Sequence, residues 1–477
     1  MEKRKIIGNS LAILINRLAQ SITTFILVAS IGRFLGTFNL GQYTLAFTYY
    51  FLFMTLTSQG FKTLFTREIS CNPHKIPEYL VNGTLLQFIF SIIGYVALVF
   101  TVFILPYSTD TSNVCYTLGL MIIPFSLSNI TEAIFQAQEK MYYIPISTVP
   151  VYILRLIIII WVLMNKYDLL FVSTILVISE TLIMLIQWYF IKPFVEPIWH
   201  INWNFMWETF QASKTFIAIE GVAVLKGRML VIILSLFSGE VTVGLFGALV
   251  QLLQPFEIIA HSLVVAVFPS MSKAVLVGKE KQRHLAEIVV EMLQCAGLPL
   301  IIGLLFIGGD ILTLVYGNSS FAEASLAMNI VALGLVVTAF TRPLGYLLVA
   351  NGFERINLIE VASTSVLTGL IGVPLISKYH LIGAAITSLI VQIATSTQYI
   401  YAVYTRLFSL RISRILVRPI IISILILIIF YILKILRFNI VTDICIATAS
   451  YIFIVACIAA YSFGWLKVVW QKMFFYK

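Results

Sequence analysis

Long apolar runs separated by short polar segments follow one another along almost the whole chain. At roughly 20 residues per bilayer crossing, this pattern predicts an all-helical membrane protein with about fourteen transmembrane helices. The predicted spans are residues 10–33, 41–64, 80–105, 115–137, 144–164, 169–191, 213–236, 242–268, 285–307, 324–350, 357–376, 382–405, 414–434 and 441–463. The first run is too long for the apolar core of a signal peptide and no small-residue cleavage site follows it, so we expect it to remain as the first helix.

The segments between the spans differ in charge on the two sides of the predicted membrane. Most of the Lys and Arg residues outside the spans fall on the side that carries the N-terminus. By the positive-inside rule, this excess places both termini in the cytoplasm. An even number of spans is required for that arrangement.

The two halves of the chain resemble each other in short sequence motifs. Gly36-x4-Gly41-Gln42-Tyr43 follows the first span, and Gly239-x4-Gly244-Leu245-Phe246 follows the seventh. Lys166-Tyr167-Asp168-Leu169 and Lys378-Tyr379-His380-Leu381 are a second such pair. This predicts a parallel repeat of two six-helix lobes, with the substrate site between them. We expect an N-lobe at residues 1–192, a linker at 193–212, a C-lobe at 213–407, and two appended helices with a tail at 408–477.

The linker carries three tryptophans at a spacing of four residues. Trp199, Trp203 and Trp207 would share one face of a helix, with Phe210 extending the stripe. Such a face suits the headgroup boundary of a membrane. The spacing favours an interfacial helix over an irregular loop.

Composition excludes several classes of protein. The chain is 60% hydrophobic and 11% charged, with a mean hydropathy of +0.99, which leaves too little polar surface for a soluble domain. The net charge of +10 does not indicate nucleic-acid binding, because the basic residues are scattered singly. The five cysteines lack metal-ligand spacing, so we expect neither a disulfide framework nor a metal site.

Several of these motifs resemble a known family. Gly32-Arg33-Phe34-Leu35-Gly36, Leu40-Gly41-Gln42-Tyr43 and Arg67-Glu68-Ile69 resemble the polysaccharide biosynthesis (Wzx-type oligosaccharide flippase) family of the multidrug/oligosaccharidyl-lipid/polysaccharide exporters. Gly244-Leu245-Phe246 followed by Phe268-Pro269 is similar to the family's second-half pattern.

The resemblance implies a MATE-like, V-shaped fold of two lobes around a cavity that opens alternately to each side. It also implies translocation of an undecaprenyl-pyrophosphate-linked oligosaccharide, such as an O-antigen, capsule or exopolysaccharide repeat unit, across the bacterial cytoplasmic (inner) membrane. A polysaccharide polymerase would be a possible partner.

Independently of the resemblance, five basic residues lie inside the predicted spans, where an unpaired charge costs several kcal/mol unless it faces protein or water. They are Arg17, Arg155, Lys226, Arg228 and Arg342. Guanidinium groups bind phosphate through a planar fork of donors, so a mostly Arg set suits a pyrophosphate. Alternatives remain. Arg17 could extend to the interface, the cations of the seventh span could form a structural salt bridge to a carboxylate on another helix, and Arg342 could have a buried partner such as a carbonyl.

Other polar residues in the spans are candidates for the same cavity. Gln20 lies on the same helix face as Arg17, one turn along. Gln251, Gln254, Glu257 and His261 form a polar arc around Pro255 that could contact sugar hydroxyls or could link helices to each other. The carboxylates Glu132, Glu180, Glu220 and Glu257 could neutralise the cations or carry protons. Coupling to H⁺ or Na⁺ is therefore possible, and no cofactor is expected.

Two other functions remain as alternatives. A MATE-type multidrug antiporter binds organic cations and should place unpaired carboxylates in its cavity. A membrane-bound polymerase or ligase needs catalytic groups on a large outward loop, whereas the outward loops near 106–114 and 308–323 are short and lack clustered acids or histidines. No Gly-rich nucleotide-binding loop is present in the sequence. We therefore predict a transporter without enzyme activity.

Overall fold

The computed structural model describes residues 2–197, 199–436 and 439–462, and in these residues all regular structure is helical. The longer elements are α1 (Glu2–Met54), α2 (Gly60–Cys71), α4 (Thr84–Ile104), α5 (Thr109–Gly119), α6 (Ile122–Ala137), α7 (Tyr143–Met164), α8 (Leu169–Ile191), α9 (Trp203–Val277), α10 (Lys279–Tyr316), α11 (Ser325–Ala350), α12 (Glu354–Arg406), α13 (Ile412–Leu436) and α14 (Ile440–Ser462). Short helical pieces join some of them: η1 (Thr55–Gln59), η2 (Pro73–Lys75), α3 (Ile76–Glu78), η3 (Tyr79–Gly83) and η4 (Ser319–Ala324).

The described residues contain 11 helices that are long and apolar enough to cross a membrane. Three of these contain one residue with non-helical backbone angles, namely Gly36 in α1, Gly239 in α9 and His380 in α12. Each such residue lies between two spans predicted from hydropathy. The protein is thus an all-helical, multi-pass membrane protein, as the sequence predicts.

Some helix boundaries agree with the hydropathy pattern and others differ. Helices α7 and α8 begin and end within one residue of the predicted spans. The fourth predicted span instead consists of α5 and α6, which are separated at Leu120 and Met121. The ring of Pro124 conflicts with the carbonyl of Leu120 four residues earlier, which accounts for the break.

The predicted linker helix is shorter than expected. The described residues of 192–202, including Trp199, are not helical, and the helix begins at Trp203 as the start of α9. Trp203 and Trp207 are 65% and 61% exposed, while Phe210 packs inward on Phe90. The tryptophans therefore lie on an outer face, and the phenylalanine anchors the helix.

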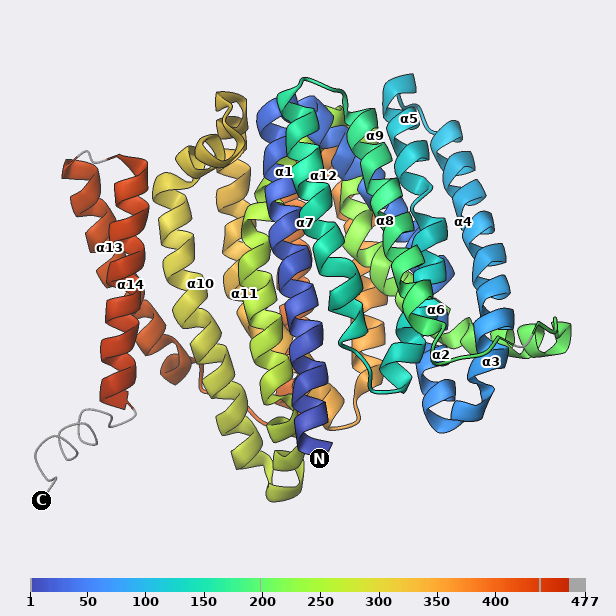
Figure 1. Cartoon of the computed structure of the whole chain (residues 1–477). Coiled ribbons are helices and arrows are strands. Elements are labelled where there is room, and N and C mark those ends of the chain that lie inside the picture. The colour runs from blue at the N-terminus through green and yellow to red at the C-terminus, as the bar shows by residue number, and fades with distance from the viewer. Residues whose placement is uncertain (1, 198, 437–438, 463–477) are drawn as a thin grey trace, which may run out of the picture. The chain divides into compact units, whose positions relative to one another are not determined.

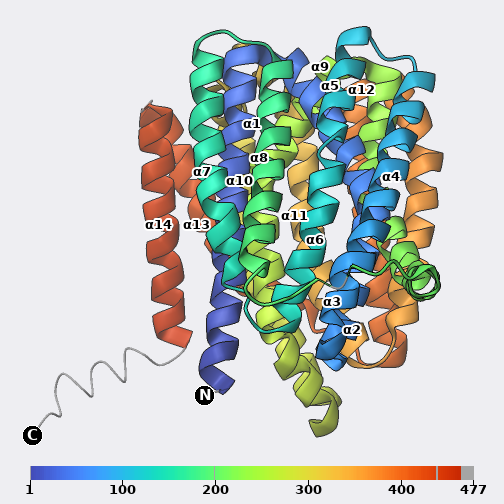
Figure 2. The ribbon, with the colours of Figure 1, turned by 45° about the vertical axis from the view of Figure 1, so that its right-hand side comes forward.

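The chain divides into two compact units. The first comprises residues 1–251, 315–320 and 365–384. Within it α1 packs against α7 and α5, α7 packs against α8, and α6 lies between α2, α4 and α8. Both ribbon views show α7 beside α1 (Figures 1 and 2). The second unit comprises residues 252–314, 321–364 and 385–477, and in its described part α13 packs against α14 and α10.

Two glycine-containing bends in the first unit contact each other reciprocally. Gly36 and Gly239 have φ angles of 82° and 73°, a region that favours glycine. Just beyond each bend, Gly41 lies directly against the backbone of Glu240, and Gly244 lies directly against the backbone of Thr37. The partners are related by one offset of 203 positions (37 and 240, 41 and 244). This reciprocity is what a repeated sequence motif would produce.

Candidate functional site

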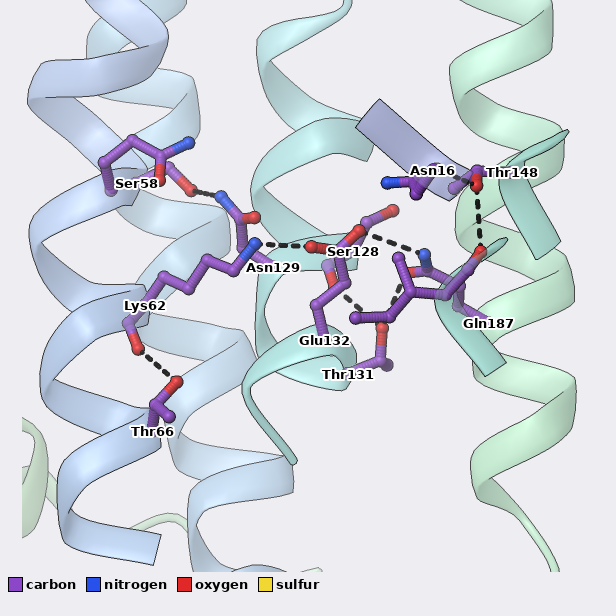
Figure 3. A network of polar contacts seen from close by, with 12 residues as sticks. Asn16, Ser58, Lys62, Thr66, Ser128, Asn129, Thr131, Glu132, Thr148 and Gln187 are labelled. Carbon is purple, nitrogen blue, oxygen red and sulfur yellow. Dashed lines mark hydrogen bonds and ion pairs between the residues drawn. The ribbon is translucent and has the colours of Figure 1, made fainter. Parts of the chain in front are cut away.

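A polar network connects α2, α6, α7 and α8 in the interior of the first unit (Figure 3). Lys62 Nζ forms an ion pair with Glu132 Oε2. Gln187 Nε2 donates hydrogen bonds to Glu132 Oε1 at 3.2 Å and to Ser147 Oγ at 3.3 Å, and Thr131 Oγ1 donates to Gln187 Oε1 at 2.8 Å. Lys62 thus contacts one carboxylate oxygen of Glu132 and Gln187 contacts the other. The carboxylate is held in one position from two sides.

The same region contains two further polar pairs that attach α1 and η1. Asn129 Nδ2 of α6 donates to Ser58 Oγ, and Thr148 Oγ1 of α7 donates to Asn16 Oδ1 at 2.6 Å (Figure 3). Ser58 lies in η1, which is a π-helical turn. Such turns shift the helix register by one residue and recur at functional sites. Together, these bonds connect six helical elements of the first unit around a polar centre.

A buried ion pair lies between α7 and α8. Arg155 Nη1 is 3.1 Å from Glu180 Oε1, and the two side chains are 9% and 11% exposed. The Arg155 guanidinium also lies 4.5 Å from the ring centre of Tyr152. Its charge is thus matched inside the unit, as one of the sequence alternatives allowed.

Arg228 in α9 has a different environment. Its guanidinium lies 4.5 Å from the ring centre of Phe51 in α1, and its side chain is half-buried. In the described part of the chain, no acidic side chain pairs with Arg228. The stacking on Phe51 offers a favourable contact to the cation, but it leaves the planar fork of donors available.

The remaining candidates of the first unit differ in exposure. Arg17 and Gln20 are exposed on α1, and among the described residues no carboxylate pairs with Arg17. Glu220 and Lys226 in α9 are half-buried, and so is Gln251. For Arg17 and Arg228, therefore, no carboxylate of the described residues matches the charge.

In the second unit, Arg342 of α11 forms an ion pair with Glu257 of α9, and each side chain is 33% exposed. His261 is half-buried, with its ring 6.3 Å from that of Tyr346, and Gln254 is exposed. Both members of the ion pair lie close to a helix proline, Pro343 and Pro255. Among the described residues, no group of three or more His, Cys, Asp or Glu could hold a metal ion.

Comparison with known proteins identifies the family. The sequence profile described as "Polysaccharide biosynthesis protein" matches residues 3–275, more than half of the chain. The chain belongs to this family. A comparison with curated proteins finds no match.

Solved structures show the fold of this polysaccharide biosynthesis protein. The lipid II flippase MurJ in an inward closed conformation has a TM-score of 0.76 and 15% identity, covering 96% of this chain and 100% of its own. An inward-facing MATE-family multidrug transporter has a TM-score of 0.63 and 13% identity, covering 83% and 98%. A MOP-superfamily transporter from Pyrococcus furiosus Vc1, whose binding pocket is described as reversed in polarity, has a TM-score of 0.54 and 13% identity, covering 85% and 96%. The chain therefore shares the fold of these three transporters.

Sequence reasoning missed some polar residues of this family member. Lys62 was not among the predicted site residues, although it lies in α2 beside Glu132. Glu360 in α12 is also buried, and it accepts hydrogen bonds from Thr395 and, at 3.4 Å, from Tyr399. A single carboxylate inside a predicted span was the available signal for Glu360.

The ion pair of Lys62 and Glu132 gives a first testable prediction. Replacing Lys62 by methionine leaves the largely buried Glu132 carboxylate without its cation, so we expect a loss of about 2 kcal/mol of stability. The melting temperature of the purified protein in detergent measures this loss. The matched control is Lys75→Met, which removes the same charge from an exposed position in η2. Equal melting temperatures for Lys62→Met and the unchanged protein would show that the pair contributes nothing.

Proposed function

We propose that this protein carries a lipid-linked oligosaccharide, anionic through its pyrophosphate, across the cytoplasmic membrane by alternating access between two lobes. The family supports a role in polysaccharide biosynthesis, and the fold supports transport. The expected passenger is an undecaprenyl-pyrophosphate-linked repeat unit of a cell-surface polymer. The lobes at 1–192 and 213–407, and fourteen crossings with both termini in the cytoplasm, are parts of the same proposal.

The observation on which the proposal depends is the half-buried guanidinium of Arg228 without a matching carboxylate among the described residues. A cation inside a membrane protein is costly unless water or an anionic ligand compensates it. A pyrophosphate would accept two parallel hydrogen bonds from this fork, and charge-assisted bonds of that kind are about twice as strong as neutral ones. Arg17, exposed on α1, would be a second phosphate ligand.

The two paired arginines have a more limited role in this proposal. Arg155 and Arg342 are each matched by a carboxylate in this structure. They could contribute to substrate binding only if the pairs separate during the transport cycle. Lys226, Gln20, Gln251, Gln254 and His261 remain proposed polar residues of the transport pathway.

The test is complementation of cells that lack the gene, with surface polymer and cytoplasmic-leaflet lipid-linked glycan as readouts. We expect Arg228→Gln to lower glycan translocation at least tenfold, because a charge-assisted bond to phosphate contributes about 1.5–3 kcal/mol. Arg228→Lys should retain part of the activity. Lys214→Gln is the matched control, since it removes an exposed charge from the same helix. Full activity of Arg228→Gln at normal protein level would contradict the proposal.

Glu220 is the observation that favours the second candidate, a MATE-type antiporter of organic cations. It is half-buried in α9, and among the described residues it has no hydrogen bond or ion pair. If the passenger is a cation, Glu220→Gln should abolish resistance to cationic drugs while Arg228→Gln leaves it unchanged. If the passenger is an anionic glycan, Arg228→Gln should lower glycan transport more than Glu220→Gln does.

A further inference from the structure

A cavity of about 580 Å³ lies in the second unit, where α10 begins and the segment between α12 and α13 passes it. Its charged lining consists of Lys279, Glu280, Lys281, His284, Glu287, Arg411 and Arg414. None of these residues belongs to the predicted transport site. The cavity therefore needs its own explanation.

The two carboxylates of this cavity are already matched by neighbouring groups. Glu280 accepts hydrogen bonds from Arg283 and, at 3.1 Å, from Arg411 Nη2. Glu287 Oε1 accepts the backbone N–H of Arg411 at 3.0 Å. The negative charges of the lining are therefore used to hold the chain after α12 against α10.

The positive charges of the lining are in excess. Lys279, Lys281 and Arg414 are exposed, and in the described part of the chain no carboxylate pairs with any of them. His284 is exposed beside them. Three unmatched cations around one cavity form a site for an anion with several acceptor oxygens, such as a phosphate group.

Exposed apolar side chains lie along both helices beside this cavity. On α13, Arg414 is followed at helical spacing by the exposed side chains of Val417, Ile421 and Ile424. On α10, His284 is followed in the same way by exposed Ile288 and Met292. The two helices are neighbours, because Arg418 Nη1 of α13 is 2.9 Å from Glu291 Oε1 of α10. Both helices thus pass within one or two turns from a charged end to a lipid-type surface.

We propose that this cavity binds the headgroup of an anionic phospholipid of the surrounding membrane. The phosphate would lie between Lys281 and Arg414, and the acyl chains would lie along the exposed apolar side chains of α10 and α13. Basic pockets between helices at the membrane boundary bind anionic headgroups in this way. A soluble anion would use only the charged end of the site, whereas a phospholipid uses both ends. The proposal does not depend on what the protein transports.

The test is lipid binding by the purified full-length protein, measured by native mass spectrometry in detergent with added phosphatidylglycerol or phosphatidylcholine. We expect preferential binding of phosphatidylglycerol. Each of Lys281→Gln and Arg414→Gln should weaken it about fivefold, which is the contribution of one basic residue near an anionic membrane surface. Lys273→Gln is the matched control, because it removes an exposed charge outside the lining. It should have no effect.

A substitution that should strengthen binding separates the proposal from misfolding. Glu280→Gln removes a negative charge and releases the side chains of Arg283 and Arg411, so phosphatidylglycerol affinity should rise several-fold. Equal binding of both lipids, or equal loss with Lys273→Gln, would overturn the proposal. Inorganic phosphate that displaces phosphatidylglycerol at millimolar concentration would show a soluble-anion site and would also overturn it.

Discussion

Replacing Glu180 by glutamine should cost the protein about 3–5 kcal/mol of stability, because the Arg155 guanidinium is then left buried without its carboxylate. Both side chains are about one-tenth exposed, and the atoms Arg155 Nη1 and Glu180 Oε1 are 3.1 Å apart. Solvent can therefore do little to compensate the remaining charge. The melting temperature of the purified protein, or its yield as a monodisperse peak in detergent, measures the loss.

The double variant Arg155→Met with Glu180→Leu separates structure from function. Replacing a buried ion pair by apolar residues of similar volume is often neutral or stabilising, so we expect stability to return. If the pair is only structural, glycan translocation returns with it. If Arg155 also contacts the pyrophosphate, the double variant is stable but inactive.

The exposed pair of Arg67 and Glu68 provides the control for this prediction. Its side chains are 57% and 33% exposed, and exposed pairs contribute about 0–1 kcal/mol. Glu68→Gln should therefore leave the melting temperature nearly unchanged. A similar loss for Glu68→Gln and Glu180→Gln would show that burial does not determine the effect.

Much of the fold could be predicted from the sequence, because the membrane requires apolar runs of a fixed length. Helices α7 and α8 follow their apolar runs closely, since the polar residues between them cannot remain in the lipid. The bends at Gly36 and Gly239 also lie where the hydropathy pattern predicts the end of one span and the start of the next. The division of the fourth span into α5 and α6 depends on Pro124, which hydropathy does not register.

The partners of the charged residues could not be predicted in the same way. A sequence places Arg155 and Glu180 in successive spans, but whether they meet depends on how α7 and α8 rotate about their axes when they pack. The same holds for Lys62 and Glu132, which are far apart in the sequence and approach through the packing of α2 on α6. The sequence therefore identifies the charged residues in the spans, and only the packing of the helices shows which cations pair with a carboxylate.

Gly41→Ala should also lower the stability of the protein strongly, because a Cβ atom at this position would overlap the carbonyl oxygen of Glu240. The obstacle is backbone and cannot rotate away, so α1 and α9 would have to separate at this end. Overpacking typically costs 1–3 kcal/mol, and we expect about 3 kcal/mol, even though alanine favours a helix more than glycine does. Gly227→Ala is the matched control in α9, since no atom lies within 4 Å of its added Cβ.

The contact is reciprocal, so the corresponding substitution at Gly244 should have a related effect. Gly244→Ala would overlap the carbonyl oxygen of Thr37 across the same contact, so the two substitutions should not be additive. Once one has separated the helices, the second should add little. Under the proposed alternating access, the separated state corresponds to opening of this end, and Gly41→Ala would favour it over the closed state.

Spin labels at Phe38 and Val241 would measure the separation directly. Both side chains are exposed, and they occupy equivalent positions beside the two bends, so labels there should not disturb the contact. In a background without the native cysteines, Gly41→Ala and Gly244→Ala should each lengthen the distance between the labels, and Gly227→Ala should not. An unchanged distance together with an unchanged melting temperature would mean that the close backbone contact does not hold α1 and α9 together.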